Sequence, residues 1–139
     1  MQSAPPDSAR SAPSAAQGEV RVLLVDDHAG VREATRMLLK SEGYHVTAVG
    51  SLGEALDHAQ KQPHPDLLVT DYHLRDGETG LQVISALRKA LRTPLRALLI
   101  TGDTPPAVNE LAADPHLRIA NKPINAGQLL ATLRELLSS

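Results

Sequence analysis

The hydrophobic residues of this chain form short continuous runs that alternate with longer amphipathic stretches. Residues 20–25 (VRVLLV) are apolar and rich in β-branched side chains, which is typical of a buried strand. Gly43 ends a stretch in which apolar or small residues recur at helical spacing, at Val31, Ala34, Thr35, Leu38 and Leu39. A second, shorter strand is predicted over residues 45–49.

The same alternation continues to the end of the chain. Ser51 and Glu54 have the spacing of a capping box, which predicts the start of another helix. Further strands are predicted over residues 66–70, 95–100 and 117–120, and a weak, short helix near residues 107–112. Two more helices are predicted from apolar faces at Leu81, Ile84, Leu87 and Leu91 and at Leu129, Leu133, Leu136 and Leu137.

These elements predict an α/β fold in which five strands alternate with five helices. The strands are continuous apolar runs rather than residues of alternating polarity, and this pattern indicates parallel strands that are buried on both faces. Right-handed crossovers between such strands give an open, doubly wound sheet.

The first 18 residues, MQSAPPDSARSAPSAAQG, have a different composition. They are mainly Ser, Ala and Pro, and they contain almost no large apolar side chain that could offset the entropy lost on ordering. They also lack the continuous apolar stretch of a signal peptide. We therefore expect residues 1–18 to be a disordered leader or linker and residues 19–139 to form one folded domain.

Composition excludes several classes of function. The formal net charge of −2 provides no basic field for nucleic acid, so no direct contact with it is expected. The chain has no cysteine, which excludes disulfides and thiolate metal sites. No apolar run approaches the ~18 residues of a membrane span. A cytoplasmic domain that does not enter the membrane is the expectation.

Polar residues follow the predicted strands where a doubly wound sheet binds its ligands, beyond the carboxyl ends of the strands. Asp26 and Asp27 follow the first strand, Asp71 the third and Thr101 the fourth, and Lys122 follows the fifth. Crowded carboxylates repel one another, and a hard cation with oxygen ligands, Mg²⁺, relieves that repulsion. A carboxylate nucleophile, Mg²⁺, a Lys and a hydroxyl donor are the groups required for phosphoryl transfer to an aspartate.

In this order and at these spacings, the residues resemble the receiver domain of two-component response regulators over about residues 20–138. The resemblance implies a flavodoxin-like fold with strand order 2-1-3-4-5. It implies that Asp71 accepts a phosphoryl group from a histidine of a sensor kinase or a phosphotransfer protein, and that the domain itself catalyses this transfer and the later hydrolysis. A weak homodimer is also compatible with the family.

The resemblance also assigns the neighbouring residues. Asp26 and Asp27 would hold Mg²⁺ together with Asp71 and the backbone carbonyl of His73. Lys122 would pair with the phosphoryl group, next to a cis bond to Pro123. Thr101 would move towards the phosphoryl group as a switch residue. The second switch position, usually aromatic, is Ile119 here, and Arg75 stands where many receivers have proline.

The loop DYHLRDGETG and the stretch LLITGDTPP are most similar to receivers of hybrid sensor histidine kinases. A stand-alone response regulator is the alternative. In other classes, a haloacid-dehalogenase-like phosphatase would require Asp-x-Asp after the first strand, where His28 stands instead. A flavodoxin-like cofactor binder would require a phosphate loop rather than DDHAG, and a pseudo-receiver would only dock partners. The six histidines are interpreted as surface or turn residues.

Overall fold

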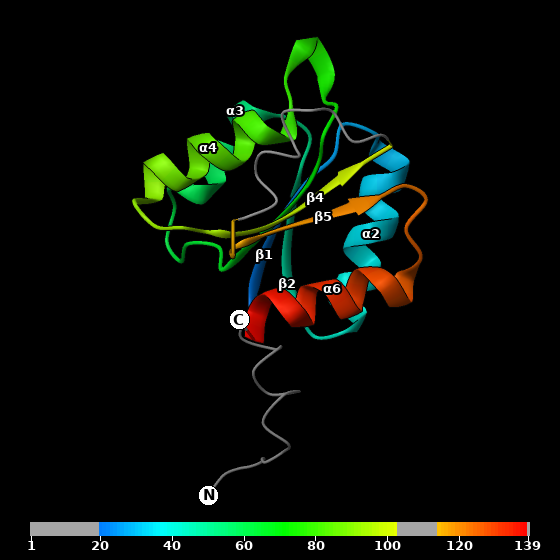
Figure 1. Cartoon of the computed structure of the whole chain (residues 1–139). Coiled ribbons are helices and arrows are strands. Elements are labelled where there is room, and N and C mark those ends of the chain that lie inside the picture. The colour runs from blue at the N-terminus through cyan, green and yellow to red at the C-terminus, as the bar shows by residue number, and fades with distance from the viewer. Residues whose placement is uncertain (1–19, 103–113, 139) are drawn as a thin grey trace, which may run out of the picture.

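The computed structural model describes residues 20–102 and 114–138, and the arrangement in this part of the chain is a five-stranded parallel sheet between helices (Figure 1). The strand order is β2-β1-β3-β4-β5, which confirms the predicted doubly wound, flavodoxin-like order. The strands are β1 (Arg21–Val25), β2 (His45–Val49), β3 (Leu67–Asp71), β4 (Arg96–Thr101) and β5 (Leu117–Asn121).

Helices cover both faces of the sheet. Helices α2 and α6 pack on one face and α3 and α4 on the other (Figure 1). The described helices are α2 (Ala29–Ser41), α3 (Leu52–Ala59), α4 (Gly80–Leu91) and α6 (Ala126–Ser138), with a short 3₁₀ turn, η1 (Arg75–Gly77). The helix expected near residues 107–112 and the leader expected over residues 1–18 lie outside the described residues.

The aliphatic core has two layers because successive strand residues point to opposite faces. Leu23, Leu68 and Leu99 are buried towards α3 and α4. The alternate residues of the same strands, such as Leu67 and Leu98, are buried towards α2 and α6. This double burial explains why the central strands show no alternation of polarity in the sequence.

Side-chain caps fix where α3 and α4 begin. The hydroxyl of Ser51 accepts a hydrogen bond from the Glu54 N–H, as the sequence predicts. The predicted capping box is wrong in its second half, because the Glu54 carboxylate accepts from the Gly50 N–H at 2.7 Å. A complete capping box does form at Thr79 and Gln82, after the loop that follows β3, and it fixes the start of α4.

The register of the parallel strands sets the position of the polar strand ends. Val25 is paired with Thr70, so Asp26 and Asp71 follow the same rung of the sheet. Asp71 is itself the last residue of β3 and is paired with Ile100, one residue before Thr101. Asn121, the partner of Thr101 on β5, precedes Lys122. The five predicted polar positions are thereby brought to one edge of the sheet.

Gly80, the first residue of α4, packs directly against the end of β3. A Cβ atom there would lie 2.4 Å from the carbonyl oxygen of Asp71 and 2.5 Å from Leu99 Cδ1. We expect Gly80→Ala to lower the free energy of unfolding by about 1–3 kcal/mol, because the backbone at the end of β3 must shift. Urea denaturation measures this, with Gly53→Ala as the control, since nothing lies within 4 Å of a Cβ at Gly53. Equal stabilities of the two variants would contradict the close contact.

Candidate functional site

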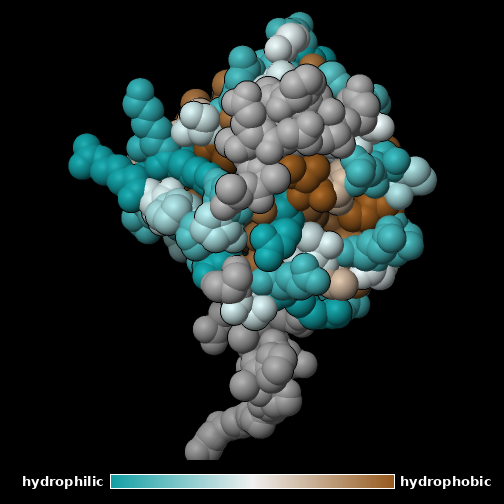
Figure 2. All heavy atoms as spheres, viewed as in Figure 1, coloured by the Kyte–Doolittle hydropathy of each residue, from teal (hydrophilic) through white to brown (hydrophobic). Residues whose placement is uncertain are grey.

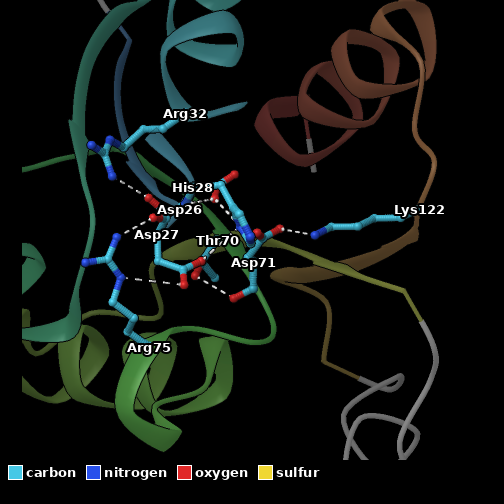
Figure 3. Close-up of polar contacts among 8 residues, drawn as sticks. All are labelled: Asp26, Asp27, His28, Arg32, Thr70, Asp71, Arg75 and Lys122. Atoms are coloured by element: carbon cyan, nitrogen blue, oxygen red, sulfur yellow. Dashed lines mark hydrogen bonds and ion pairs between the residues drawn. The ribbon is translucent and has the colours of Figure 1, made fainter. Parts of the chain in front are cut away.

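Three carboxylates meet at the carboxyl edge of the sheet. Asp26 and Asp71 are buried, with relative exposures of 4% and 5%, and the Asp27 side chain is 15% exposed. One ligand atom from each of Asp26, Asp27, His28 and Asp71 can be chosen so that all lie within 4.8 Å of one another. Figure 3 shows these side chains pointing towards a common centre. The acidic pocket, as we call these three aspartates, is thus as compact as a metal site.

Lys122 reaches the acidic pocket from the loop after β5. Its Nζ atom lies 3.1 Å from Asp71 Oδ1, while the Lys side chain is 46% exposed (Figure 3). The Lys122 N–H donates to the Thr101 carbonyl at 2.8 Å, and the peptide bond between Lys122 and Pro123 is cis. The ammonium group therefore lies between Asp71 and solvent, where an incoming anion would meet it.

Burial, followed by the negative charge of Asp26, raises the pKa of Asp71 to about 6. The hydrogen bond and the charge of Lys122 act in the opposite direction and offset only part of this effect. Ionisation of the Asp71 carboxyl group consequently lowers the stability of the folded chain. This is the situation in which a cation or a covalent modification that removes the charge is favourable.

Because the pKa of Asp71 is raised to about 6 in the folded chain, the fold loses stability as the pH rises from about 4 to about 6, and the full loss remains at higher pH. We expect Asp71→Asn, without Mg²⁺, to be more stable than the natural chain by about 1–3 kcal/mol at pH 7.5. The gain should shrink as the pH falls from about 6 towards 4, where Asp71 is protonated in the folded chain and about half protonated in the unfolded one. Urea denaturation at both pH values tests this, and a variant that is less stable at pH 7.5 would contradict it.

The donor set suits a hard divalent cation. All three aspartates offer oxygen, and among the described residues Asp27 Oδ1 is a fully buried atom that accepts no hydrogen bond. The ring of His28 lies beside this oxygen, with its Nδ1 3.2 Å away. A buried oxygen of this kind is stable only with a partner. The acidic pocket therefore fits Mg²⁺, which prefers carboxylate oxygen and water.

Two residues next to the acidic pocket were not assigned to it from the sequence. His28 is an exposed residue, as expected, yet its N–H donates to Asp26 Oδ1 at 2.9 Å and its ring lies against Asp27. Arg75, noted only as a departure from the family pattern, donates to the Asp27 carbonyl at 2.8 Å (Figure 3). The position of His28 directly after the two aspartates was the available signal, whereas the Arg75 contact depends on the fold of η1.

Arg75 places a positive charge beside Asp27, since its Nε lies 3.9 Å from Asp27 Oδ2 and its side chain is 70% exposed. Removal of this charge should strengthen Mg²⁺ binding, because cations repel one another. We expect Arg75→Ala to raise the Mg²⁺ affinity by up to about fivefold, the scale of an exposed ion pair. A Mg²⁺ titration followed by NMR measures this, with Lys89→Ala on α4 as the control. Weaker binding in the Arg75 variant would show that Arg75 instead supports the site.

The remaining predicted residues lie around this centre. Thr101 is buried at the end of β4, with a relative exposure of 1%. Ile119, on β5, is paired with Leu99 and packs against the core beneath α3 and α4. The His73 ring lies edge-to-face on Tyr72, with centroids 4.8 Å apart, in the loop that joins Asp71 to η1. Asp76 and Gly77 form a turn in this loop, with φ angles of 59° and 76°.

An apolar groove adjoins the acidic pocket. It is a cavity of about 640 Å³ between α2 and α6, and it reaches from Val31 and Leu38 to Ile124 and Leu129. Asp71 and Lys122 line the same cavity. In Figure 2, hydrophobic side chains come to the surface beside α2 and over β5, on a face that is otherwise mainly hydrophilic. Val31, on α2, is 56% exposed. We call this cavity the apolar groove.

The chain matches a known protein family over most of its length. The family described as response regulator receiver domain matches residues 22–134. The chain is 36% identical over 87 residues to the transcription regulator BvgA of Bordetella pertussis, covering 61% of this chain and 40% of that protein. It is 32% identical over 116 residues to the DNA-binding response regulator MtrA of Mycobacterium tuberculosis, covering 82% of this chain and 49% of MtrA.

Solved structures share the fold. A CheY-like receiver domain protein from Methanospirillum hungatei superposes with a TM-score of 0.75 at 26% identity, covering 86% of this chain and 94% of that one. The chemotaxis protein CheY4 of Vibrio cholerae gives 0.75 at 28% identity, covering 84% and 98%. With the family match over residues 22–134 and the acidic pocket at the carboxyl edge, these comparisons show that the chain belongs to the response regulator receiver domain family.

Proposed function

We propose that this domain accepts a phosphoryl group on Asp71 from a histidine of a sensor kinase or a phosphotransfer protein. The observation that supports this most strongly is the geometry of Asp71. Its carboxylate is buried at the carboxyl end of β3 among two other aspartates, and one of its oxygens lies 3.1 Å from Lys122 Nζ. A nucleophile, a set of metal ligands and a cation for the transferred group are thereby in contact.

In the proposed reaction, an Asp71 oxygen attacks the phosphorus atom of the phosphohistidine. One O–P bond forms, the N–P bond breaks, and the released imidazole takes up a proton from solvent. Lys122 is placed to pair with a phosphoryl oxygen, since it is already within 3.1 Å of the nucleophile. Burial and Asp26 raise the free energy of the Asp71 carboxylate. The acyl phosphate that forms carries still more negative charge, so the product depends on Lys122 and a bound cation for charge compensation.

Receiver domains generally bind Mg²⁺ at an acidic pocket, and the three aspartates present here fit that ion. Asp26 and Asp27 would hold it, directly or through water, together with Asp71 and the His73 carbonyl. When bound, Mg²⁺ would neutralise the charge that develops on the transferred phosphoryl group. The buried Asp27 Oδ1, which accepts no hydrogen bond among the described residues, is a ready ligand atom.

We further propose that Thr101 reports the phosphoryl group by moving towards it. Its place at the end of β4, one residue beyond the partner of Asp71, supports this role. Ile119 occupies the second switch position. Because an aliphatic side chain there has no large ring to rotate, the output of this domain would be carried by Thr101 and the adjoining backbone rather than by an aromatic flip.

The apolar groove is the proposed docking surface for the phosphodonor. It begins at Asp71 and Lys122 and continues along α2 and α6, so a helix seated in it could present a phosphohistidine to Asp71. The exposed Val31 is suited to an apolar contact at the rim. Receiver domains interact with histidine kinases or phosphotransfer proteins, which are the partners proposed here.

The longer protein to which this domain contributes is a separate proposal. The chain spans 40% of BvgA and 49% of MtrA. BvgA is named a transcription regulator and MtrA a DNA-binding response regulator. These relatives favour a response regulator over the receiver of a hybrid histidine kinase, which the loop sequences suggested. The coding sequence on either side of this chain distinguishes the two, since only the receiver of a hybrid kinase adjoins a kinase core.

No helix within residues 20–102 and 114–138 is long and apolar enough to cross a membrane.

The experiment that tests the proposed function is phosphorylation by a small donor. Acetyl phosphate with Mg²⁺ should add the mass of one phosphoryl group per chain, as seen by intact mass spectrometry, and a chelator should prevent the addition. Turnover of generic phosphate esters without a labelled protein would instead favour a phosphatase. Absence of any mass gain with Mg²⁺ present would contradict the proposal.

A further inference from the structure

A second cavity lies along the free edge of the sheet, far from the acidic pocket. Its volume is about 490 Å³, and it runs along β2 at the amino ends of β1 and β2, where α2 and α3 finish. Arg21 and His45, the first residues of β1 and β2, line it. Asp71 ends β3 at the opposite, carboxyl edge of the same sheet. We call this second cavity the basic cavity.

The lining of the basic cavity is strongly cationic. Four permanent cations and two histidines contribute to it: Arg21, Arg36, Lys40 and Lys61, with His45 and His58. Within residues 20–102 and 114–138, no Asp or Glu lines it. These residues come from β1, α2, β2, α3 and the segment after α3, so the charge is built by the fold rather than by one helix face. A concave site with this charge selects an anion.

The charges of the basic cavity are only partly neutralised by the protein. Arg36 forms an ion pair with Glu33, and the hydrogen bond from Arg36 is the main cause of the lowered pKa of Glu33. The backbone N–H of Arg21 donates to Asp66 Oδ2 at 2.9 Å, and this contact does not neutralise the Arg21 guanidinium. In contrast, the structure records no ion pair for Lys40 or Lys61 with any residue in 20–102 and 114–138. The exposed ammonium groups of Lys40 and Lys61 are therefore available to a ligand in the cavity.

Part of the remaining lining is apolar, beside the polar residues Tyr44, Thr47 and Gln62, and this apolar part narrows the chemistry of the ligand. Val46 of β2 and the loop residues Pro63 and Pro65 line the same cavity as the cations. A volume of about 490 Å³ suits a small molecule better than a flat macromolecular surface. Arg and Lys are the side chains that bind phosphate best, and phosphate provides several acceptor oxygens for several cations at once.

We propose that the basic cavity binds a small organic molecule that carries a diphosphate or triphosphate group. The phosphates lie against Lys40, Lys61 and Arg36, and the organic part lies against Val46 and the two prolines. The site is independent of the chemistry at Asp71, because it lies at the other end of the strands.

The test is a titration of the full chain, labelled with ¹⁵N, with ADP in metal-free buffer. Amide shifts should change at Lys40, at residues 44–47 and at Lys61. The double variant Lys40→Gln/Lys61→Gln should weaken ADP binding by about tenfold or more, because two charge-assisted contacts are lost. Its matched control is Lys89→Gln/Arg92→Gln at the end of α4, which removes two exposed cations outside the cavity and should leave the affinity unchanged.

Three results would overturn the proposal. Shift changes confined to Asp26, Asp71 and Lys122 would place the phosphates in the acidic pocket. Citrate binding as tightly as ADP would show that the cavity selects anions in general rather than phosphates. Inorganic pyrophosphate binding as tightly as ADP would remove the role assigned to the apolar lining. Tighter binding of ADP than of both, lost in the Lys40 and Lys61 variant alone, is the result expected.

Discussion

Replacement of Asp71 by asparagine is expected to abolish phosphorylation of the domain by acetyl phosphate. An amide is not nucleophilic, and no other carboxylate in the described part of the chain combines this burial with contact to Lys122. Urea denaturation of the same variant, which is expected to show a gain in stability, separates loss of labelling from unfolding. Intact mass spectrometry after incubation with donor and Mg²⁺ gives the result directly.

The matched control for this variant is Asp57→Asn. Asp57 is an exposed acid on α3, outside the acidic pocket, and the same chemical change there should leave labelling intact. Undiminished labelling of the Asp71 variant would remove Asp71 from its proposed role. Loss of labelling in both variants would indicate a general effect of charge rather than loss of the nucleophile.

Asp27→Asn should have the second largest effect, through the metal. The substitution replaces a carboxylate with a neutral amide at the side chain whose Oδ1 is buried without a hydrogen bond. We expect the phosphorylation rate at millimolar Mg²⁺ to fall roughly 100-fold, because a metal ion contributes several kcal/mol to charge stabilisation in the transition state. Much of the loss should be recovered at higher Mg²⁺ concentration, which a rate measurement over a range of Mg²⁺ detects.

Asp76→Asn is the control for the metal prediction. Asp76 is an exposed acid in the same loop, with a φ of 59° that asparagine tolerates well. Its substitution should leave the Mg²⁺ dependence unchanged. A Mg²⁺ dependence that is also unchanged in Asp27→Asn would show that Asp27 does not hold the ion.

Much of the fold and the centre of the site could be predicted from the sequence. The runs at residues 20–25 and 66–70 indicate buried parallel strands because both faces of such strands need apolar residues. Once the strands are parallel, their carboxyl ends must share one edge, so Asp26 and Asp71 lie at the same edge of the sheet. Their close approach requires in addition that β1 and β3 are neighbours. The order of the strands came from the family resemblance and is confirmed by the structure.

Boundaries and contacts within loops were harder to predict. Asp71 belongs to β3 rather than following it, because strand ends are set by pairing across the sheet, here with Ile100. The contact of Arg75 with Asp27 joins residues 48 positions apart and depends on the η1 turn, which no local pattern specifies. The second half of the capping box at Ser51 was predicted wrongly, because the Glu54 carboxylate accepts from the Gly50 N–H instead of the Ser51 N–H.

The basic cavity was even harder to predict from the sequence. Arg21, Lys40 and Lys61 are separated along the chain and belong to different elements, and a net charge of −2 gives no hint of a cationic site. Only the crossovers of the doubly wound sheet bring these residues together at the edge of β2. Charge that is dispersed in the sequence can thus be concentrated by topology.

The most direct test of the central claim is to locate the phosphoryl group. After reaction with acetyl phosphate and Mg²⁺, reduction with borohydride converts a phosphorylated aspartate to homoserine, which peptide mass spectrometry can assign to one position. We expect homoserine at position 71 and unchanged residues at Asp26 and Asp27. A modified Asp26 or Asp27, or a phosphoryl group on His28 or His73 with Asp71 unmodified, would contradict the account.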